Sequence, residues 1–321
     1  MDLEMVFNEL SLRSPASSVE QARQWMTQFI SLVITLTRQG VNRILRTGAD
    51  FHIAKLAPDY SLVNWRNDNE VSREERQFFR ALTTKAPYLA DLLQIQQTAL
   101  ASEFFYQGRK SPQSALGLGY AYLLEAIAIS LPSAKRWQHP SIQVEHRWIE
   151  ADENIYSEQV EVKHCCHPDH VATHQDWIAK RLQTGVRDGV DLWSRRDSLF
   201  PVLSFCESVA TAIQEFSSGG VMLRQVVKRL FELEIYCRDW QEGGFEPDKL
   251  PCKVSPESQT TLEQYGQERT FICPDGVKRV FSWHVRLTPG AWRVHFFPEP
   301  STRRIIIGYV GPHLPTTSNP T

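Results

Sequence analysis

The sequence predicts an α+β protein with a mixed α+β domain over residues 1–175 and a helical section over 176–240, then a linker over 241–256 and a small antiparallel β-sheet domain over 257–321. Three observations support this prediction: a capped, periodic helix near the N-terminus, an alternating hairpin pattern near the middle, and three alternating segments near the C-terminus. A chain of 321 residues also exceeds the usual size of one domain.

The N-terminal region opens with a strand-like segment at 4–12, which is followed by a helix start. Ser18 and Gln21 have the spacing of a capping box, and apolar residues then recur every three or four positions, which predicts a helix to about Gly40. The pattern from 51 to 64 is strand-like, with a turn at Pro58–Asp59.

A second capping box, at Ser72 and Glu75, predicts another helix. Residues 97–107 fit either a strand or a helix, and an apolar stretch at 113–131, stopped by Pro132, predicts a helix. The alternating segments 142–149 and 155–162 predict a hairpin.

Residues 177–239 have mainly helical spacing, and they define the helical section. The stretch 241–256 contains Gly243, Gly244 and three prolines, a composition that is typical of a linker.

Composition limits the classes of function. The net charge of -2 does not favour nucleic acid or an anionic membrane as a partner of the whole chain, so such a partner needs a local basic patch. The apolar run Phe29–Leu36 is too short for a membrane span or a signal peptide, so we expect no membrane partner. Six cysteines are too sparse for a disulfide framework, which predicts a reducing, cytoplasmic location.

The C-terminal segments 278–287, 292–297 and 304–310 alternate in strand fashion and are separated by turns at Pro289–Gly290 and 298–302. Three consecutive antiparallel strands fit this spacing. From residue 270 to 321 there are six basic and two acidic residues, which gives a local charge of +4. The basic patch that the whole chain lacks is therefore expected here.

The stretch from His284 to Phe296, with Arg303–Leu314, resembles the RelE superfamily of toxin nucleases over roughly 45 residues of the chain. The matching features are alternating basic residues before a turn, an aromatic-Arg pair after it, and an apolar strand that ends in Gly and is followed by His. The resemblance implies a small β-sheet domain with two supporting helices, which residues 200–240 would supply. It also implies mRNA cleavage at the ribosome, with RNA or the ribosome and an antitoxin as partners.

The resemblance also suggests site residues. His284 and Arg286 fall on the family's alternating basic positions, Arg293 on its phosphate-binding arginine, and His313 on the basic residue after the last strand. Cleavage by the 2′-hydroxyl needs a base, an acid and fixed positive charge, so either histidine fits either proton role and the two arginines fit phosphate. The expected substrate-binding residues are Arg303, Arg304, Tyr309 and His295.

Two readings of this region stay open. In the first, the chain is a toxin-type ribonuclease of stress response or phage defence, which residues 1–175 regulate or target. In the second, it is a non-catalytic subunit of a larger assembly that uses the same fold for binding. The basic side chains would then lie on the solvent face of a sheet whose core is Val285, Leu287, Val294 and Phe296.

A possible metal site lies outside this region. Zinc takes four nitrogen or sulfur ligands, and the densest set of such side chains contains Cys165, Cys166, His170 and His174. Adjacent cysteines rarely reach one ion together, so the alternative is that both pack as small apolar groups. No other cofactor is expected from the sequence.

Overall fold

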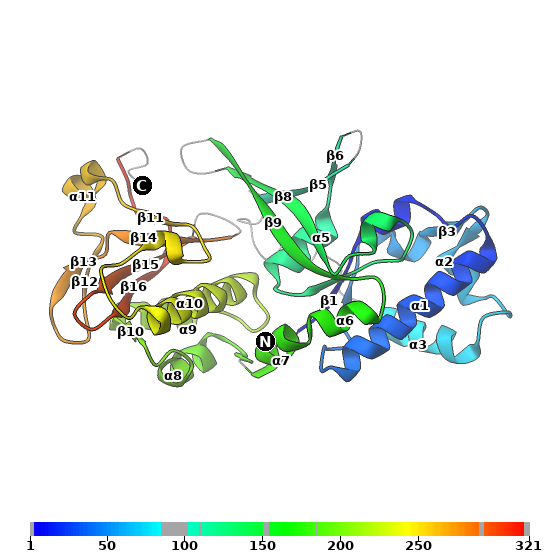
Figure 1. Cartoon of the computed structure of the whole chain (residues 1–321), viewed down its shortest axis with the longest axis horizontal. Coiled ribbons are helices and arrows are strands. Elements are labelled where there is room, and N and C mark those ends of the chain that lie inside the picture. The colour runs from blue at the N-terminus through cyan, green and yellow to red at the C-terminus, as the bar shows by residue number, and fades with distance from the viewer. Residues whose placement is uncertain are drawn as a thin grey trace. The chain divides into compact units, whose positions relative to one another are not determined.

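The computed structural model describes residues 3–84, 102–108, 111–149, 154–183, 185–288 and 292–317. The expected turn at Pro289–Gly290 lies outside the described residues. The chain forms two compact units, of which the first is Asp2–Trp148 with Tyr156–Gly185 and the main part of the second is Val186–Thr321 (Figure 1). Both contain helices and sheets, so the α+β class is confirmed.

The first unit begins with a short strand and a long helix. Its strands are β1 (Met5–Phe7), β2 (Leu45–Arg46), β3 (Lys55–Ala57), β4 (Tyr60–Ser61), β5 (Ser102–Gln107), β6 (Pro112–Ser114), β7 (Ile127–Ile129), β8 (Ser141–Ile149) and β9 (Ile155–Cys165). Its α-helices are α1 (Val19–Arg38), α2 (Leu62–Arg66), α3 (Arg73–Thr83), α5 (Leu116–Leu123), α6 (Asp169–Thr173) and α7 (Gln175–Gln183). Its 3₁₀ helices are η1 (Glu9–Arg13), η2 (Ala49–Ile53) and η4 (Lys135–Trp137).

A mixed sheet organises the first unit, in the order β2-β1-β7-β9-β8-β5-β6. The pairs β1–β2, β1–β7 and β7–β9 are parallel, whereas β5 is antiparallel to β6 and β8. The predicted hairpin is confirmed as β8 and β9. Helix α1 is also confirmed, and the Ser18 side chain accepts a hydrogen bond from the Gln21 amide at 3.2 Å.

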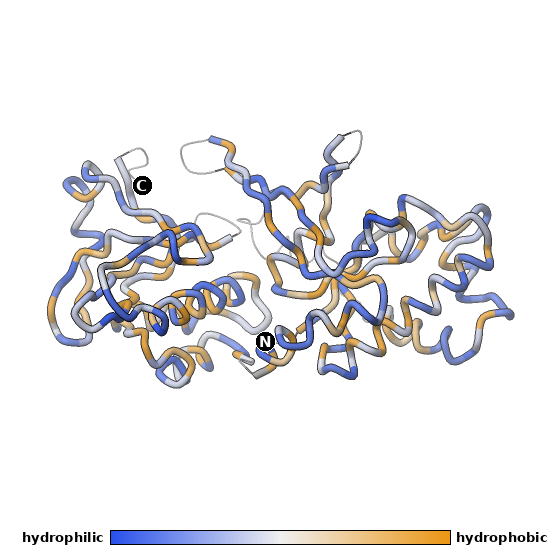
Figure 2. Tube along the Cα trace, viewed as in Figure 1, coloured by the Kyte–Doolittle hydropathy of each residue, from blue (hydrophilic) through white to orange (hydrophobic). Residues whose placement is uncertain are grey.

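Along α1, hydrophobic residues recur among hydrophilic ones, as expected of a helix with one buried face (Figure 2). Its buried residues join the core of the first unit, where Phe29 meets Phe7 of β1 edge to face at 5.8 Å. The second predicted capping box is also present, because Ser72 accepts from the Glu75 amide at the start of α3.

The predicted helix over 113–131 is only partly confirmed, because the helix covers Leu116–Leu123 alone. Helix α5 ends at Leu123, Glu125 has a left-handed φ of 48°, and the chain then forms β7 between β1 and β9. All residues of β7 are buried. A central parallel strand buried on both faces has a continuous apolar sequence, which periodicity does not separate from a buried helix.

The strand-like segment 51–64 is only partly confirmed. β3 and β4 form the predicted pair, and Asp59 lies in their turn with a φ of 55°. The chain before them is η2, and Ser61 caps α2 after them.

The second unit is built around a five-stranded sheet in the order β10-β16-β15-β14-β11. Its strands are β10 (Leu203–Phe205), β11 (Val254–Pro256), β12 (Thr270–Ile272), β13 (Lys278–Val280), β14 (Trp283–Leu287), β15 (Trp292–Glu299) and β16 (Arg304–Pro312). Its α-helices are α8 (Gly189–Leu199), α9 (Ala210–Gln214), α10 (Val221–Asp239) and α11 (Gln259–Tyr265), and its 3₁₀ helices are η5 (Glu207–Val209) and η6 (Pro247–Lys249).

The three predicted C-terminal strands are confirmed as the antiparallel run β14–β15–β16. Helix α10 packs against β10, β14 and β16. The inward residues of the sheet form one core with α10, and the main contributors from the sheet are Val285, Leu287, Val294, Phe296, Ile305 and Ile307.

Three expectations for this unit differ from the structure. The section 176–240 is not all helical, because Leu203–Phe205 is strand β10 and pairs in parallel with β16. The stretch 241–256 contains η6 and β11, and β11 pairs with β14, so it belongs to the folded unit. The segment 278–287 is interrupted at Phe281, which is fully buried, and forms β13 and β14.

Among the described residues, no helix combines the length and the apolar character that crossing a membrane requires.

Candidate functional site

The expected catalytic strands carry their polar residues on the face of the second-unit sheet that is turned away from α10. Val285 and Val294 lie in the core with α10. Successive residues of a strand point to opposite faces, so their neighbours point to the other side of the sheet. These neighbours are His284 and Arg286 on β14 and Arg293 and His295 on β15.

The strand register brings these residues into direct opposition. His284 pairs with His295, and Arg286 pairs with Arg293. Tyr309 of β16 is opposite His295, with 5.7 Å between their ring centroids, and the two histidine rings are 5.3 Å apart. The structure therefore places five of the sequence-predicted residues side by side.

Residues 257–281, which we call the covering segment, add a carboxylate and a guanidinium to this face. Oε1 of Glu257 lies 3.0 Å from Nε of Arg269, 3.4 Å from Nδ1 of His284 and 4.0 Å from Nδ1 of His295. The segment is fixed to the sheet where the Glu257 amide donates to the carbonyl oxygen of Ser282 at 2.7 Å. Sequence reasoning missed Glu257 and Arg269, because no local pattern distinguishes them from solvent-exposed charges.

The Glu257 carboxylate is ionised in the folded protein. Burial acts to raise the pKa of Glu257, but the contacts with His284 and Arg269 outweigh it and lower the pKa to about 2. The side chain of Glu257 is 6% exposed and that of Arg269 is fully buried, so this ion pair lies inside the protein.

His295 is neutral under ordinary conditions. Burial lowers its pKa to about 3, and the charges of His284 and Arg269 act in the same direction. The residue is 1% exposed, and its Nδ1 lies 3.4 Å from the carbonyl oxygen of Phe281. His295, an expected substrate-binding residue, is therefore closed to substrate in this conformation. Its ring lies beside that of His284, with 5.3 Å between the centroids.

His313 follows β16 and shares the electrostatic environment of the face. Burial and then the charge of Arg293 lower the pKa of His313. Its Nδ1 lies 2.7 Å from the carbonyl oxygen of Leu314. Because a carbonyl only accepts hydrogen bonds, Nδ1 carries the hydrogen and Nε2 keeps a lone pair.

Access to the face is restricted. Arg293 is 4% exposed, and Phe271 of the covering segment stacks on Tyr309 with ring centroids 6.1 Å apart. His284 keeps 17% of its side chain exposed, and Arg286 and His313 are half-buried. A phosphate group therefore meets Arg286 and His284 before Arg293.

The remaining two expected substrate-binding residues lie elsewhere. Arg304 begins β16 opposite Glu299, whereas Gly311 near the other end of that strand is opposite Arg293. Seven residues of strand correspond to about 23 Å. The exposed Arg303 and Arg304 are thus not brought together with the other predicted residues.

The basic patch is smaller than the sequence count suggests. Arg279 is held by Asp275 at 2.7 Å and by Glu299 at 3.2 Å, and its hydrogen bonds with Asp275 and then Cys273 raise its pKa. The arginines that lie on the face itself are Arg286 and Arg293.

Within the described ranges, the only group of three His, Cys, Asp or Glu side chains with ligand atoms within 4.8 Å of one another is Glu257, His284 and His295. Two imidazoles and a carboxylate are suitable ligand types for a transition metal. However, Arg269 already occupies the same carboxylate oxygen, and Arg286 and Arg293 add positive charge nearby.

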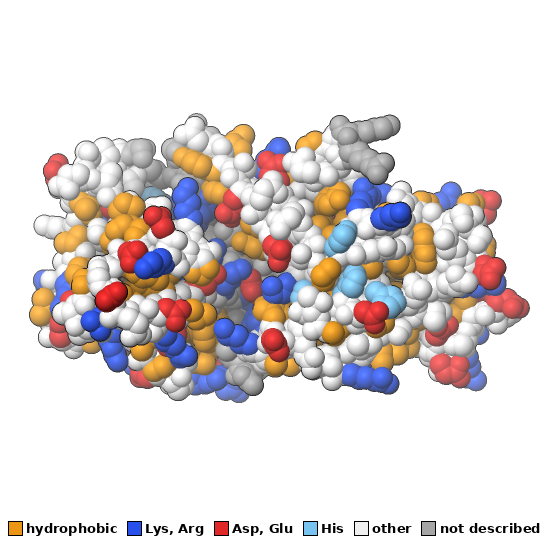
Figure 3. Space-filling model, viewed as in Figure 1, with side chains coloured by type: hydrophobic (Ala, Val, Ile, Leu, Met, Phe, Trp, Pro, Cys, Tyr) orange, Lys and Arg blue, Asp and Glu red, His pale blue; other side chains and the backbone are white. Residues whose placement is uncertain are grey.

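The expected zinc candidates of the first unit are not assembled around a common point. Cys165 and Cys166 are buried, and burial raises the pKa of the Cys166 thiol to about 11. His174 Nε2 lies 2.8 Å from the carbonyl oxygen of Pro140, and the Cys166 amide donates to Nδ1 of His170 at 3.4 Å. Figure 3 shows histidine side chains gathered on the visible face of this unit.

The first unit also contains a buried serine-histidine pair that the sequence pattern did not predict. Oγ of Ser130 lies 2.7 Å from Nε2 of His164, and Asn8 donates to the same hydroxyl. All three residues are fully buried, and burial lowers the pKa of His164 to about 4. Without access for a substrate, this network is structural.

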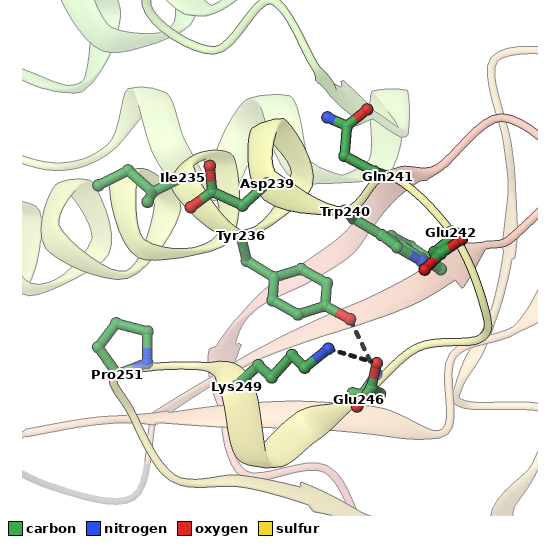
Figure 4. Close-up of a pocket in the computed structure, with 9 residues that line it drawn as sticks. All are labelled: Ile235, Tyr236, Asp239, Trp240, Gln241, Glu242, Glu246, Lys249 and Pro251. Carbon is green, nitrogen blue, oxygen red and sulfur yellow. Dashed lines mark hydrogen bonds and ion pairs between the residues drawn. The ribbon is translucent and has the colours of Figure 1, made fainter.

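A cavity of about 400 Å³ lies at the C-terminal end of α10 (Figure 4). Its walls include Asp239, Glu242 and Glu246, and Lys249 is bound to Glu246 at 2.7 Å. In Figure 4 the ring of Tyr236 lies between Asp239 and Glu246. The excess of carboxylates repels a phosphate, and none of the predicted site residues lines the cavity.

Comparisons of the chain with known protein families, with curated proteins and with solved structures find no match.

Proposed function

We propose that the second unit binds RNA and cleaves its phosphodiester backbone, as a toxin-type ribonuclease that resembles the RelE superfamily. The observation that carries this proposal is the position of His284 and the opposed Arg286–Arg293 pair on one sheet face, with His313 directly after the neighbouring strand β16. The antiparallel run β14–β15–β16, with α10 on its other face, supports the resemblance.

The reaction uses only groups of the RNA and of this face. The 2′-oxygen attacks phosphorus as its proton passes to a base, the new O2′–P bond forms and the P–O5′ bond breaks. An acid gives a proton to the departing 5′-oxygen, so the products are a 2′,3′-cyclic phosphate and a 5′-hydroxyl. No water, metal ion or oxidant enters this step.

The hydrogen bonds and charges beside the two histidines support one assignment of the proton roles. His313 is the base, because Nδ1 donates to Leu314 and the lone pair on Nε2 is left to accept a proton. His284 is the acid, because the Glu257 carboxylate places a negative charge beside a ring that must carry a positive one.

Arginine guanidinium groups bind phosphate oxygens in bidentate fashion. Arg286 and Arg293 lie directly opposite each other on neighbouring strands, so one phosphate can contact both. They would stabilise the charge that develops on the phosphate oxygens in the transition state. Arg293 becomes available to RNA only when the groups that cover it move.

The test is cleavage of RNA by the full chain, with product ends analysed for 2′,3′-cyclic phosphate. We expect His313→Ala to reduce the rate about 10²–10⁴-fold, the usual contribution of a general base. Arg303→Ala serves as the matched control, because it removes an exposed arginine of the same unit outside the site. Unchanged cleavage by the double variant His284→Ala/His313→Ala would refute the proposal.

Ribosome dependence is tested separately by sequencing RNA ends after brief expression of the wild type and of Arg286→Ala. Cuts inside translated frames that disappear in the variant support action at the ribosome. Cuts without regard to reading frame support free RNA as the substrate. In either case the first unit would regulate or target the nuclease, and an antitoxin is the expected protein partner.

One observation favours a second function, in which this face binds RNA or protein without cutting. Arg293 and His295 are almost completely buried, so part of the proposed site is closed. This function predicts that the wild type retains RNA on a filter without producing new ends, and that Arg286→Ala weakens retention.

A further inference from the structure

Among the described residues, Glu257 is the carboxylate that lies against the ring of His284, and it contacts the buried nitrogen Nδ1. The contact of 3.4 Å is between Oε1 and Nδ1 of His284. Catalytic hydrogen bonds are often long in the free protein and shorten when the substrate binds.

The ionisation state of Glu257 decides which nitrogen of His284 carries the hydrogen in the neutral ring. An ionised carboxylate only accepts hydrogen bonds, so the nitrogen that faces it must be the donor. The Nδ1–Oε1 contact is of ion-pair length and lacks hydrogen-bond geometry in this conformation, but the negative charge still favours a hydrogen on the nitrogen that faces it, which leaves the other nitrogen as the acceptor. Nδ1 of His284 therefore keeps its hydrogen, and Nε2 is the atom that exchanges a proton.

Arg269 fixes the position of this carboxylate. Its Nε forms an ion pair with Oε1 of Glu257 at 3.0 Å, and its terminal nitrogens donate to the carbonyl oxygens of Tyr265 at 3.3 Å and Leu314 at 3.5 Å. The arginine side chain is fully buried. These contacts hold the oxygen that faces His284 in one place.

We propose that Glu257 is a positioning residue of the cleavage reaction, which holds His284 as the Nδ1–H tautomer and so presents Nε2 to the leaving 5′-oxygen. This inference rests on the proposed function for its role, but the tautomer itself is independent of activity. The other groups that face His284 are His295 from β15, Arg269 from the covering segment, and His313 after β16. Arg269 is a cation and cannot accept a hydrogen bond, so it cannot take the place of Glu257 as the group that Nδ1–H of His284 faces.

The first test uses the wild-type full chain and needs no activity. Histidine nitrogens are labelled with ¹⁵N, long-range proton-nitrogen spectra are recorded at about pH 8, where a histidine of ordinary pKa is neutral, and the His284 signals are assigned by their loss in His284→Gln. We expect the Nδ1–H tautomer. The Nε2–H tautomer, or a rapid average of the two, would overturn the inference whether or not the chain cuts RNA.

The second test separates binding from catalysis. Glu257→Gln keeps the size of the side chain and removes its charge, so we expect kcat to fall about 10²-fold while KM changes little. Glu268→Gln is the matched control, because Glu268 is an exposed carboxylate of the same segment. An unchanged kcat in folded Glu257→Gln would also overturn the inference, whereas a wild type that cuts no RNA would overturn only the proposed function.

Discussion

Replacement of Arg269 by Met should destabilise the second unit, because it leaves the Glu257 carboxylate buried without its guanidinium partner. The folded-state pKa of Glu257 is about 2 and its ordinary value is 4.5. This difference of about 2.5 pKa units corresponds to about 3.4 kcal/mol of stability from all partners of the carboxylate. His284 supplies the larger part of the lowering and Arg269 the smaller, so we expect Arg269→Met to cost about 1–2 kcal/mol.

The pH dependence follows from the sign of the shift. A carboxylate with a lowered folded-state pKa stabilises the protein above its unfolded value, and this contribution is lost as the pH falls toward the folded value. The wild type should therefore lose the contribution of Glu257 between about pH 4.5 and pH 2. Arg269→Met should show a smaller loss over the same range.

The assay is urea unfolding followed by tryptophan fluorescence, since Trp283 and Trp292 lie in the second-unit sheet. The two units require separate fits, because a chain with more than one domain need not unfold in one step. Glu257→Gln/Arg269→Met should be more stable than Arg269→Met, because no charge is left buried. Exposed Arg303→Ala is the control. A cost for Arg269→Met below about 0.5 kcal/mol, as for a surface change, would refute the reasoning.

Two further predictions concern stability. Burial lowers the pKa of His164 to about 4, so the free energy of unfolding of the first unit should fall by up to about 3.4 kcal/mol as the pH falls from about 6.5 to 4. In urea unfolding at a series of pH values, His164→Gln should reduce this dependence on pH. A Cβ at Gly189 would lie 1.8 Å from the carbonyl oxygen of Ile213, so Gly189→Ala should cost at least about 1–3 kcal/mol in thermal unfolding. Gly244→Ala, with no atom within 4 Å, should change the midpoint little, and equal effects would contradict the packing argument.

The features that sequence predicted correctly are local ones. Caps such as Ser18 and Ser72 satisfy amides three residues away, and the hairpin of β8 and β9 alternates along its own strands. By contrast, the short strands β7 and β10 gain their stability from partners far along the chain. Their sequences contain only a brief apolar run, so pattern alone assigns them to neighbouring helices.

The candidate site divides in the same way. Alternation correctly placed His284 with Arg286 and Arg293 with His295, because face-sharing depends only on strand geometry. The burial of His295 and the pair Glu257–Arg269 depend on how residues 257–281 lie across the sheet, and no spacing rule describes that path.

The parallel pairing of β10 with β16 has a practical consequence for the isolation of the C-terminal strands. A fragment cut at residue 257 would keep β14–β16 but discard β10, α10 and β11, which would expose the inner surface of the sheet and two of its edges to water. Such a fragment should aggregate rather than act. A fragment for expression should therefore begin at Val186, so that strands β14–β16 are kept together with the helices that precede them.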